Sequence, residues 1–181
     1  MNILNHVAFI MDGNGRWGLK RKKGRNFGHL KGVETVKKIV TASLRLNIPI
    51  ITFYVFSSEN WKRPKKERNY LFKLIKNYFL KETENIIKQG IKLQILGEVK
   101  KFSTDLKLVL KKSTLLTKKN KKIIVNLAIN YGSRTEILKS AKKTRNNLSI
   151  KNINKNLYTK KMPDPDILIR TGGYQRLSNF L

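Results

Sequence analysis

Apolar residues recur along the chain with two spacings that alternate from one segment to the next. Short β-branched or aromatic runs predict buried strands, and apolar residues at every third or fourth position predict helices with one buried face. The expected strands are Val7–Met11, Ile50–Phe56, Ile91–Leu96, Ile123–Asn130 and Asp166–Arg170. The expected helices are Val33–Leu46, Lys65–Gln89, Thr104–Thr117 and Arg134–Leu148, and the segment Lys151–Lys161 is expected to form a short polar helix and a surface loop.

This alternation predicts the α/β class, with a mostly parallel central sheet flanked by helices on both faces. The chain has 181 residues, of which 40% are hydrophobic, and neither a repeat nor a linker interrupts the pattern. That length suffices for one core, so we expect residues 1–181 to form a single domain. In a parallel sheet the loops that follow the strands lie at one edge, where their residues can form one site.

The loop after the first strand has the composition of a phosphate site. It reads MDGNGRW, residues 11–17. The carboxylate of Asp12 can hold a divalent metal, the two glycines let backbone N–H groups approach an anion, and Arg16 can contact two phosphate oxygens. A tight turn is the alternative, because glycine and asparagine tolerate positive φ. The glycine spacings of the nucleotide P-loop and of the dinucleotide fold are both missing.

Arginine is sparse in this lysine-rich chain, yet it recurs in the loops after strands or beside glycines. These arginines are Arg16, Arg25, Arg63, Arg170 and Arg176. A planar guanidinium forms two parallel hydrogen bonds to an oxyanion, which an ammonium group does not. The positions of the arginines therefore predict contacts with phosphate or carboxylate groups.

The formal net charge is +29, from 40 Lys and Arg against 11 Asp and Glu. A nucleic acid-binding surface is one interpretation of this excess. The other, which we favour, is compositional drift toward lysine, because the lysines are scattered rather than gathered in one tract.

The chain has no cysteine, which excludes disulfides and thiolate chemistry and fits a cytoplasmic location. Its longest apolar run, Ile48 to Phe56, is too short to span a bilayer.

Several long motifs together resemble the cis-prenyltransferases, and among these the undecaprenyl diphosphate synthases. They are HVAFIMDGNGRW (6–17), RNFGH (25–29), TFYVFSSENWKRP (52–64), NLAINYG (126–132), DILIRTGG (166–173) and RLSNF (176–180). The motifs follow one another in the order that the family has. A series in register is far more specific than any one of its members.

The resemblance implies an enzyme that condenses isopentenyl diphosphate with an allylic primer, usually farnesyl diphosphate, and forms new Z double bonds. The implied product is a long-chain polyprenyl diphosphate, undecaprenyl diphosphate, which carries cell-wall glycans. Asp12 would be catalytic and would bind Mg2+. The primer diphosphate would be held by Gly13, Asn14, Gly15, Arg16, Arg25 and His29. The isopentenyl diphosphate would be held by Arg170, Arg176, Leu177 and Ser178.

The family pattern associates Asn60 with removal of a proton. Because a neutral amide is a poor base, we expect Asn60 to orient a diphosphate oxygen or a water that takes the proton. The residues expected to line the same pocket or to wall it are Trp17, Ser57, Ser58, Glu59, Trp61 and Arg63. The alternative is a plain strand-to-helix turn, with Glu59 and Arg63 paired at the surface. By analogy with the family, the helix Lys65–Gln89 would wall a channel for the hydrocarbon.

Two departures from the family pattern change these expectations. Tyr174 stands where the family has an acidic residue, which affects the orientation of Arg176. The sequence ends at Leu181, whereas the family continues with a strand, helices and a glutamate implicated in Mg2+ binding. The resemblance thus implies a homodimer whose C-terminal part is missing here, and contact with the inner membrane surface stays open. The alternatives are an inactive remnant or partner subunit and, from charge alone, a nucleic acid-binding protein.

Overall fold

The computed structural model describes residues 4–181, and its centre is a five-stranded sheet. The strands are β1 (His6–Ile10), β2 (Ile50–Ser57), β3 (Ile91–Leu96), β4 (Ile123–Tyr131) and β5 (Ile167–Arg170). They lie in the order β3-β4-β2-β1-β5, and every neighbouring pair is parallel. The predicted fold class is confirmed, and the carboxyl ends of all the strands meet at one edge of the sheet.

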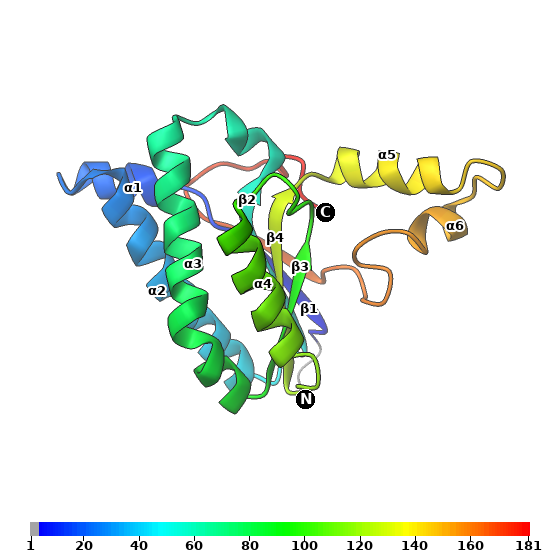
Figure 1. Cartoon of the computed structure of the whole chain (residues 1–181), viewed down its shortest axis with the longest axis horizontal. Helices are drawn as coiled ribbons and strands as arrows, with labels where there is room; N and C mark the ends of the chain where they lie inside the picture. Colours follow the sequence, from blue (N-terminus) through cyan, green and yellow to red (C-terminus); the bar gives the residue numbers. More distant parts are fainter. Residues whose placement is uncertain (1–3) are drawn as a thin grey trace.

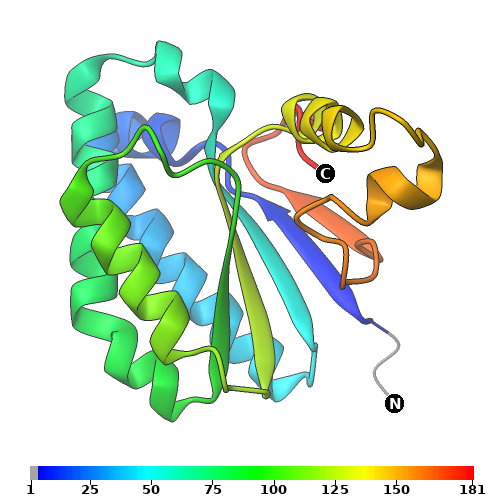
Figure 2. The same cartoon turned by 45° about the vertical axis from the view of Figure 1, so that its right-hand side comes forward.

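Three long helices cover one face of the sheet (Figure 1). They are α2 (Gly24–Arg45), α3 (Lys65–Lys88) and α4 (Thr104–Leu116). On the opposite side lie α5 (Ser133–Lys143), α6 (Ile150–Asn154) and the segment that leads into β5, as Figure 2 shows. Two short elements follow strands at the carboxyl edge, α1 (Asn14–Lys20) after β1 and the 3₁₀ helix η1 (Ser58–Lys62) after β2.

The two faces of the sheet carry cores of very different size. Under α2–α4 lies a large cluster that includes Ile51, Phe53, Phe79 and Leu106. The cluster on the other face has few members, which are Ala8, Ile10, Tyr54, Leu96, Ala128, Tyr131 and Phe180. Hydrophobic stabilisation is proportional to the apolar area buried, so most of it comes from the first face.

The structure differs from the predicted elements mainly between residues 14 and 32, where α1 and the start of α2 were not predicted. Glycines made this segment a poor helix candidate, but here they let two helices touch. A Cβ on Gly28 would lie 1.8 Å from the carbonyl oxygen of Asn14, and one on Gly18 would lie 2.2 Å from that of Gly24. The helices α1 and α2 therefore pack backbone against backbone, which places the loop after β1 beside α2.

The predicted helix Arg134–Leu148 ends earlier, because α5 stops at Lys143. A turn follows in which the N–H of Asn147 donates to the carbonyl of Thr144. Asn146 and Asn147 have low helix propensity, which favours an end of the helix before them. Within residues 4–181, no helix is both long enough and apolar enough to cross a membrane.

Candidate active site

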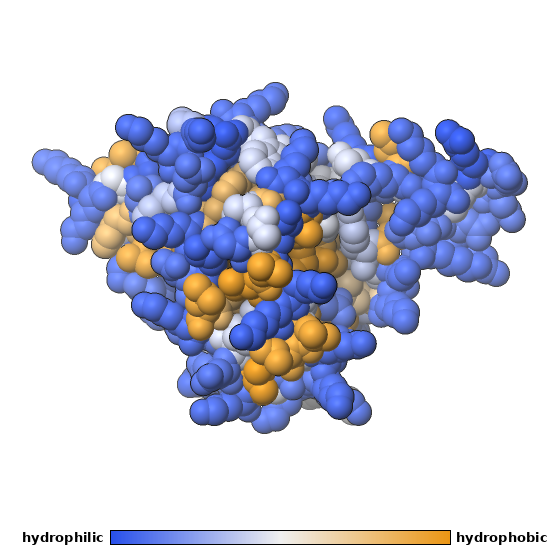
Figure 3. Space-filling view, in the orientation of Figure 1, coloured by the Kyte–Doolittle hydropathy of each residue, from blue (hydrophilic) through white to orange (hydrophobic). Residues whose placement is uncertain are grey.

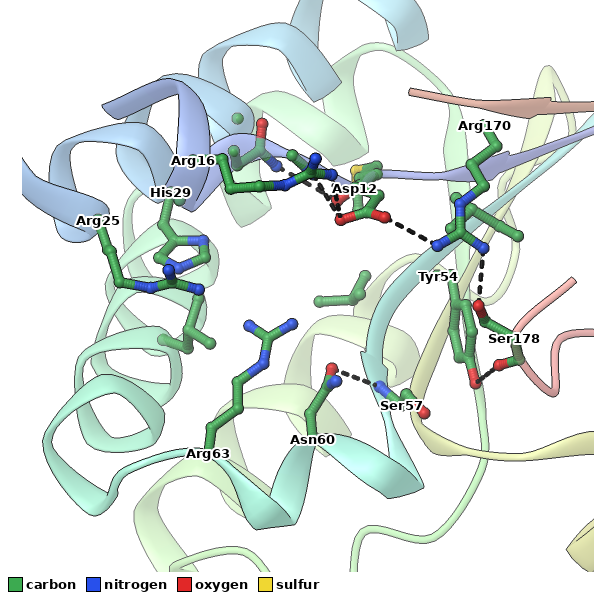
Figure 4. Close-up of a pocket in the computed structure, with 18 of the residues that line it drawn as sticks. Asp12, Arg16, Arg25, His29, Tyr54, Ser57, Asn60, Arg63, Arg170 and Ser178 are labelled. Carbon is green, nitrogen blue, oxygen red and sulfur yellow. Dashed lines mark hydrogen bonds and ion pairs between the residues drawn. The ribbon is translucent and has the colours of Figure 1, made fainter. Parts of the chain in front are cut away.

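A cavity of about 270 Å³ opens at the carboxyl edge of the sheet, between the loops after β1, β2 and β5 and the helices α2 and α3. Figure 4 shows how side chains from these elements point toward one another across it. Most of the predicted site residues line it: Asp12, Gly13, Asn14, Gly15, Arg16, Arg25, His29, Ser57, Glu59, Asn60, Arg63, Arg170, Arg176 and Ser178. Residues far apart in the sequence therefore share one cavity, as the parallel topology predicts.

Asp12 lies at the end of β1 between two arginines. Its Oδ2 accepts a hydrogen bond from Nη2 of Arg170 at 2.8 Å, and its Oδ1 lies 3.5 Å from Nη2 of Arg16. The backbone N–H of Gly13 donates to Oδ1 at 2.6 Å. Burial alone would raise the pKa of Asp12, but the hydrogen bonds from Arg170 and Gly13 and the charges of both arginines outweigh it. The pKa of Asp12 therefore lies below its usual range, and the carboxylate is ionised at neutral pH.

Arg170 joins Asp12 to the last residues of the chain. Its Nη1 donates to Oγ of Ser178 at 2.7 Å and also to the carbonyl of Arg176. Its Nε is buried and has no hydrogen-bond partner among residues 4–181. One guanidinium thus fixes the carboxylate and the segment after β5 relative to each other.

Tyr174 holds two further cations at this end of the cavity. The guanidinium of Arg16 lies 4.6 Å from the centre of the Tyr174 ring, and that of Arg176 lies 5.0 Å from it. Cation–π attraction of this kind is worth about 0.5–1 kcal/mol at an exposed site. In this chain an aromatic ring, in place of the acidic residue expected there, orients Arg176.

A second group of basic side chains surrounds Glu67 on the first turn of α3. Nε of Arg25, Nε2 of His29 and Nη1 of Arg63 each lie 3.2 Å from a carboxylate oxygen of Glu67. Burial lowers the pKa of His29, the two arginines lower it further, and Glu67 opposes them. Glu67 is not among the site residues predicted from the sequence. The available signal was its spacing of four residues from Arg63, because such pairs meet on a helix surface.

Asn60 is held in place by a reciprocal cap at the start of η1. The backbone N–H of Ser57 donates to Oδ1 of Asn60 at 3.0 Å, and the N–H of Glu59 donates to Oγ of Ser57 at 3.1 Å. Because its oxygen is engaged, Asn60 presents its Nδ2 donors. No hydrogen-bond partner of this amide nitrogen occurs among the described residues. The Glu59–Arg63 surface pair of the alternative interpretation is not formed, since Arg63 pairs with Glu67.

Tyr54, which was not predicted as a site residue, also lines the cavity. Its hydroxyl lies 3.2 to 3.3 Å from the carbonyl oxygens of Tyr131, Ser178 and Asn179. Its ring stacks on Phe180 with centroids 4.4 Å apart. Tyr54 thereby fixes the segment that carries Ser178. Tyr54 lies in a run that predicts only a buried strand, so the sequence does not indicate this contact.

The far wall of the cavity is apolar. Leu71, Leu74 and Ile75 of α3 line it together with Val33 of α2. This matches the expectation that the helix beginning at Lys65 contributes an apolar wall. The lining of the cavity therefore combines cationic and apolar side chains.

The structure places four predicted residues outside this cavity. Trp17 stacks on Phe27, and Trp61 packs among Phe56, Phe72 and Phe102 while its Nε1 donates to Oδ1 of Asn130 at 2.8 Å. Ser58 lines a neighbouring hollow with Trp61, and Leu177 is mostly exposed. Their roles in substrate binding stay predictions.

Asp12 is the residue whose chemistry suits Mg2+. No group of three or more His, Cys, Asp or Glu side chains within residues 4–181 could hold a metal. Mg2+ is commonly bound by one or two carboxylates together with substrate phosphates. A single aspartate among arginines that suit a diphosphate fits that pattern.

Comparisons with known proteins agree with the geometry. The family described as "Putative undecaprenyl diphosphate synthase" matches residues 10–181. The isoprenyl transferase of Clostridium tetani is 43% identical over 99% of this chain and 74% of its own length. The (2E,6E)-farnesyl-diphosphate-specific ditrans,polycis-undecaprenyl-diphosphate synthase of Haemophilus influenzae is 40% identical over 99% of this chain and 80% of its own length.

Two solved structures share the fold. Lavandulyl diphosphate synthase from Lavandula x intermedia, in complex with dimethylallyl diphosphate, has a TM-score of 0.93 and 29% identity over 98% of this chain and 81% of its own. A probable undecaprenyl diphosphate synthase from Campylobacter jejuni has a TM-score of 0.82 and 32% identity over 99% of this chain and 80% of its own. With its motifs gathered around one cavity, the chain belongs to the undecaprenyl diphosphate synthase family of isoprenyl transferases, the cis-prenyltransferases.

Proposed function

We propose that this chain condenses isopentenyl diphosphate with farnesyl diphosphate and forms a long-chain Z-polyprenyl diphosphate, undecaprenyl diphosphate. The observation that carries the proposal is the division of the cavity lining into two kinds of side chain. The lining includes the cationic Arg16, Arg25, Arg63, Arg170 and Arg176 and the apolar Leu71, Leu74 and Ile75 of α3. A prenyl diphosphate has the same division into a charged head and a hydrocarbon tail.

The two groups of cations correspond to two diphosphates. The group on α1, α2 and α3, with Arg25 and His29, would hold the primer, and the group around Arg170 would hold isopentenyl diphosphate. Asp12 and Arg16 lie between them. Holding both substrates at one edge converts a bimolecular reaction into an effectively unimolecular one.

In the reaction, the allylic C–O bond breaks, the isopentenyl alkene forms the new C–C bond, and a proton leaves the alkene substrate. Departure of the diphosphate requires that its developing charge be neutralised, which the arginines facing Asp12 do. Asp12 would hold Mg2+ together with diphosphate oxygens, and the bound ion would add charge neutralisation at the leaving group.

The cap at η1 supports a positioning role for Asn60 in proton removal. Its Oδ1 accepts from Ser57 N–H, which leaves Nδ2 to donate to a diphosphate oxygen. An amide that donates in this way orients the oxygen that takes the proton and does not take the proton itself. Asn60→Ala removes the donor without placing a negative charge beside the diphosphate. We expect it to lower kcat strongly while substrate binding is retained, and equal loss of binding would contradict this role.

The decisive experiment is incubation with farnesyl diphosphate, labelled isopentenyl diphosphate and Mg2+, followed by analysis of product length. We expect polyprenyl products that disappear when a chelator removes the metal and return when Mg2+ is added back. No product at any enzyme concentration would support the inactive alternative. A homodimer and a cytoplasmic location stay predictions, which size-exclusion chromatography and cell fractionation test.

A further inference from the structure

The solvent face of α4 carries large apolar side chains that nothing in the active site explains. Leu108 and Leu115 of α4 are 60% and 65% exposed, and Leu80 of α3 is 63% exposed. Leu116 is also exposed. Figure 3 shows apolar side chains gathered over α3 and α4 on this side of the molecule. We call Leu80, Leu108, Leu115 and Leu116 the leucine patch.

Contacts between α3 and α4 show that the leucines of the patch lie on two neighbouring helices. Nζ of Lys76 lies 2.6 Å from Oδ2 of Asp105, and Oγ1 of Thr83 lies 2.8 Å from Oγ of Ser113, so α3 and α4 run side by side. Leu80 lies between Lys76 and Thr83 along α3, and Leu108 follows Asp105 by almost one turn. Leu115 is seven residues after Leu108, on the same stripe of α4.

Lysines are interspersed with the leucines of the patch and follow them along the chain. Lys111 and Lys112 lie on α4, and the tract KKNKK follows the helix at residues 118–122. These six lysines are exposed, and none of them forms an ion pair with any residue in the described part of the chain. The one acidic residue of α4, Asp105, is already paired with Lys76. The face therefore combines exposed leucines with lysines whose positive charge is not compensated by an ion pair within the described residues.

We propose that this face docks on the surface of an anionic phospholipid bilayer. Leucines interspersed with lysines suit such a surface, because the apolar side chains enter the headgroup region while the lysines contact anionic lipids. A nucleic acid would use the lysines but would gain nothing from four exposed leucines, because its outer surface is phosphate and sugar. The apolar component favours the bilayer.

Docking on a bilayer goes beyond the proposed prenyl transfer but is consistent with it. The product of the proposed reaction is a long hydrocarbon, which dissolves in the bilayer rather than in water. Vesicle binding is measured without substrates. Failure of docking would leave the proposed reaction standing, and failure of the reaction would leave docking standing.

The test is sedimentation of the full chain with vesicles of phosphatidylcholine and phosphatidylglycerol, compared with vesicles of phosphatidylcholine alone. We expect binding to the anionic vesicles and at least about tenfold weaker binding by the double variant Leu108→Glu/Leu115→Glu. Its control is Leu138→Glu/Leu148→Glu, which changes the net charge equally at comparably exposed leucines of the α5 region and should bind as the wild type does.

The contribution of the lysines to vesicle binding is tested with two double variants. Lys111→Gln/Lys112→Gln should weaken binding by about fivefold per lysine, whereas the doublet Lys142→Gln/Lys143→Gln on α5 should have little effect. Circular dichroism melting verifies that the variants fold. If Leu108→Glu/Leu115→Glu melts early, Leu115→Ser alone replaces it.

Two outcomes would overturn the proposal. One is an equal loss of binding in the α4 variants and in their α5 controls, which would mean that net charge alone is recognised. The other is tight, salt-sensitive binding of a random oligonucleotide that the leucine substitutions leave unchanged, without vesicle binding, which would make the lysines a nucleic acid-binding surface.

Discussion

Two carboxylates organise the cations of this cavity, and they do so in different ways. Asp12 lies on a loop after a strand, and its side chain is 30% exposed. Glu67 lies on the first turn of a helix, and its side chain is 10% exposed. Asp12 lines the cavity, whereas Glu67 does not. Both contact arginines, but only Asp12 faces the space where a ligand would lie.

This difference in exposure between Asp12 and Glu67 shows that pairing with arginine does not by itself identify a catalytic carboxylate. Both carboxylate oxygens of Glu67 contact basic side chains, those of Arg25, His29 and Arg63, and the side chain of Glu67 is largely buried. Both oxygens of Asp12 are also contacted, by the N–H of Gly13 and by Nη2 of Arg170, but its side chain is more exposed and lines the cavity. We infer that Glu67 positions the cations, whereas Asp12 acts on the ligand. Substitutions at the two sites should therefore separate activity from stability.

The largest expected effect is that of Asp12→Asn on turnover. The substitution keeps the shape of the side chain and removes the charge proposed to hold Mg2+, so kcat should fall by about 10²–10³-fold. The free energy of unfolding should change by less than about 1 kcal/mol, because the pair with Arg170 is partly solvated. Labelled product formation and urea unfolding measure the two quantities. Asp105→Asn, a surface aspartate on α4, is the matched control and should leave kcat unchanged.

The next effect concerns Arg170, which connects Asp12 to Ser178. Arg170→Lys keeps the charge but replaces the fork with a single ammonium, which cannot contact both partners in the same geometry. We expect kcat/KM for isopentenyl diphosphate to fall by about 10–100-fold. Steady-state kinetics with isopentenyl diphosphate varied measure kcat/KM. Arg45→Lys, the same substitution at an exposed arginine, is the control. A normal kcat/KM in Arg170→Lys would show that charge alone suffices here.

The strands and the edge where the site lies could be predicted from the sequence, because β-branched runs such as residues 50–56 strongly favour the strand conformation. The sequence also predicted most of the cavity lining, since loops after parallel strands share one edge. It did not predict α1, because the contact of Gly28 with Asn14 depends on how two helices pack. Glu67 and Tyr54 were missed for the same reason, as their partners lie on other elements. Trp61 was placed in the pocket, but it packs in the core beside Asn130.

A smaller effect is expected from Glu67→Gln, and it should appear in stability. The amide keeps the volume but leaves three basic side chains without a counter-charge. Hydrogen bonds to charged groups contribute about 1.5–3 kcal/mol, and the exposure of Arg25 reduces this, so the loss should be about 1–2 kcal/mol. Turnover should stay within about threefold of the wild type. If kcat instead falls as far as in Asp12→Asn, the distinction between the two carboxylates is wrong.

The smallest effect is a pH dependence of stability from His29. Burial holds the pKa of His29 below its ordinary value of 6.5, so the unfolded chain takes up a proton first as the pH falls. Stability from this residue is therefore complete above about pH 6.5 and decreases as the pH falls toward the folded pKa. Urea unfolding from about pH 7.5 to about pH 5.5 should show a steeper loss in the wild type than in His29→Gln.

The same measurement sharpens the comparison of the two carboxylates. Glu67 raises the pKa of His29 and so limits the loss of stability in acid. In Glu67→Gln the pKa of His29 should fall further, and the acid-dependent loss should extend to lower pH. Asp12→Asn should leave this pH profile unchanged, because Asp12 does not contact His29. Identical profiles for wild type and Glu67→Gln would mean that Glu67 does not control the charge of this cluster.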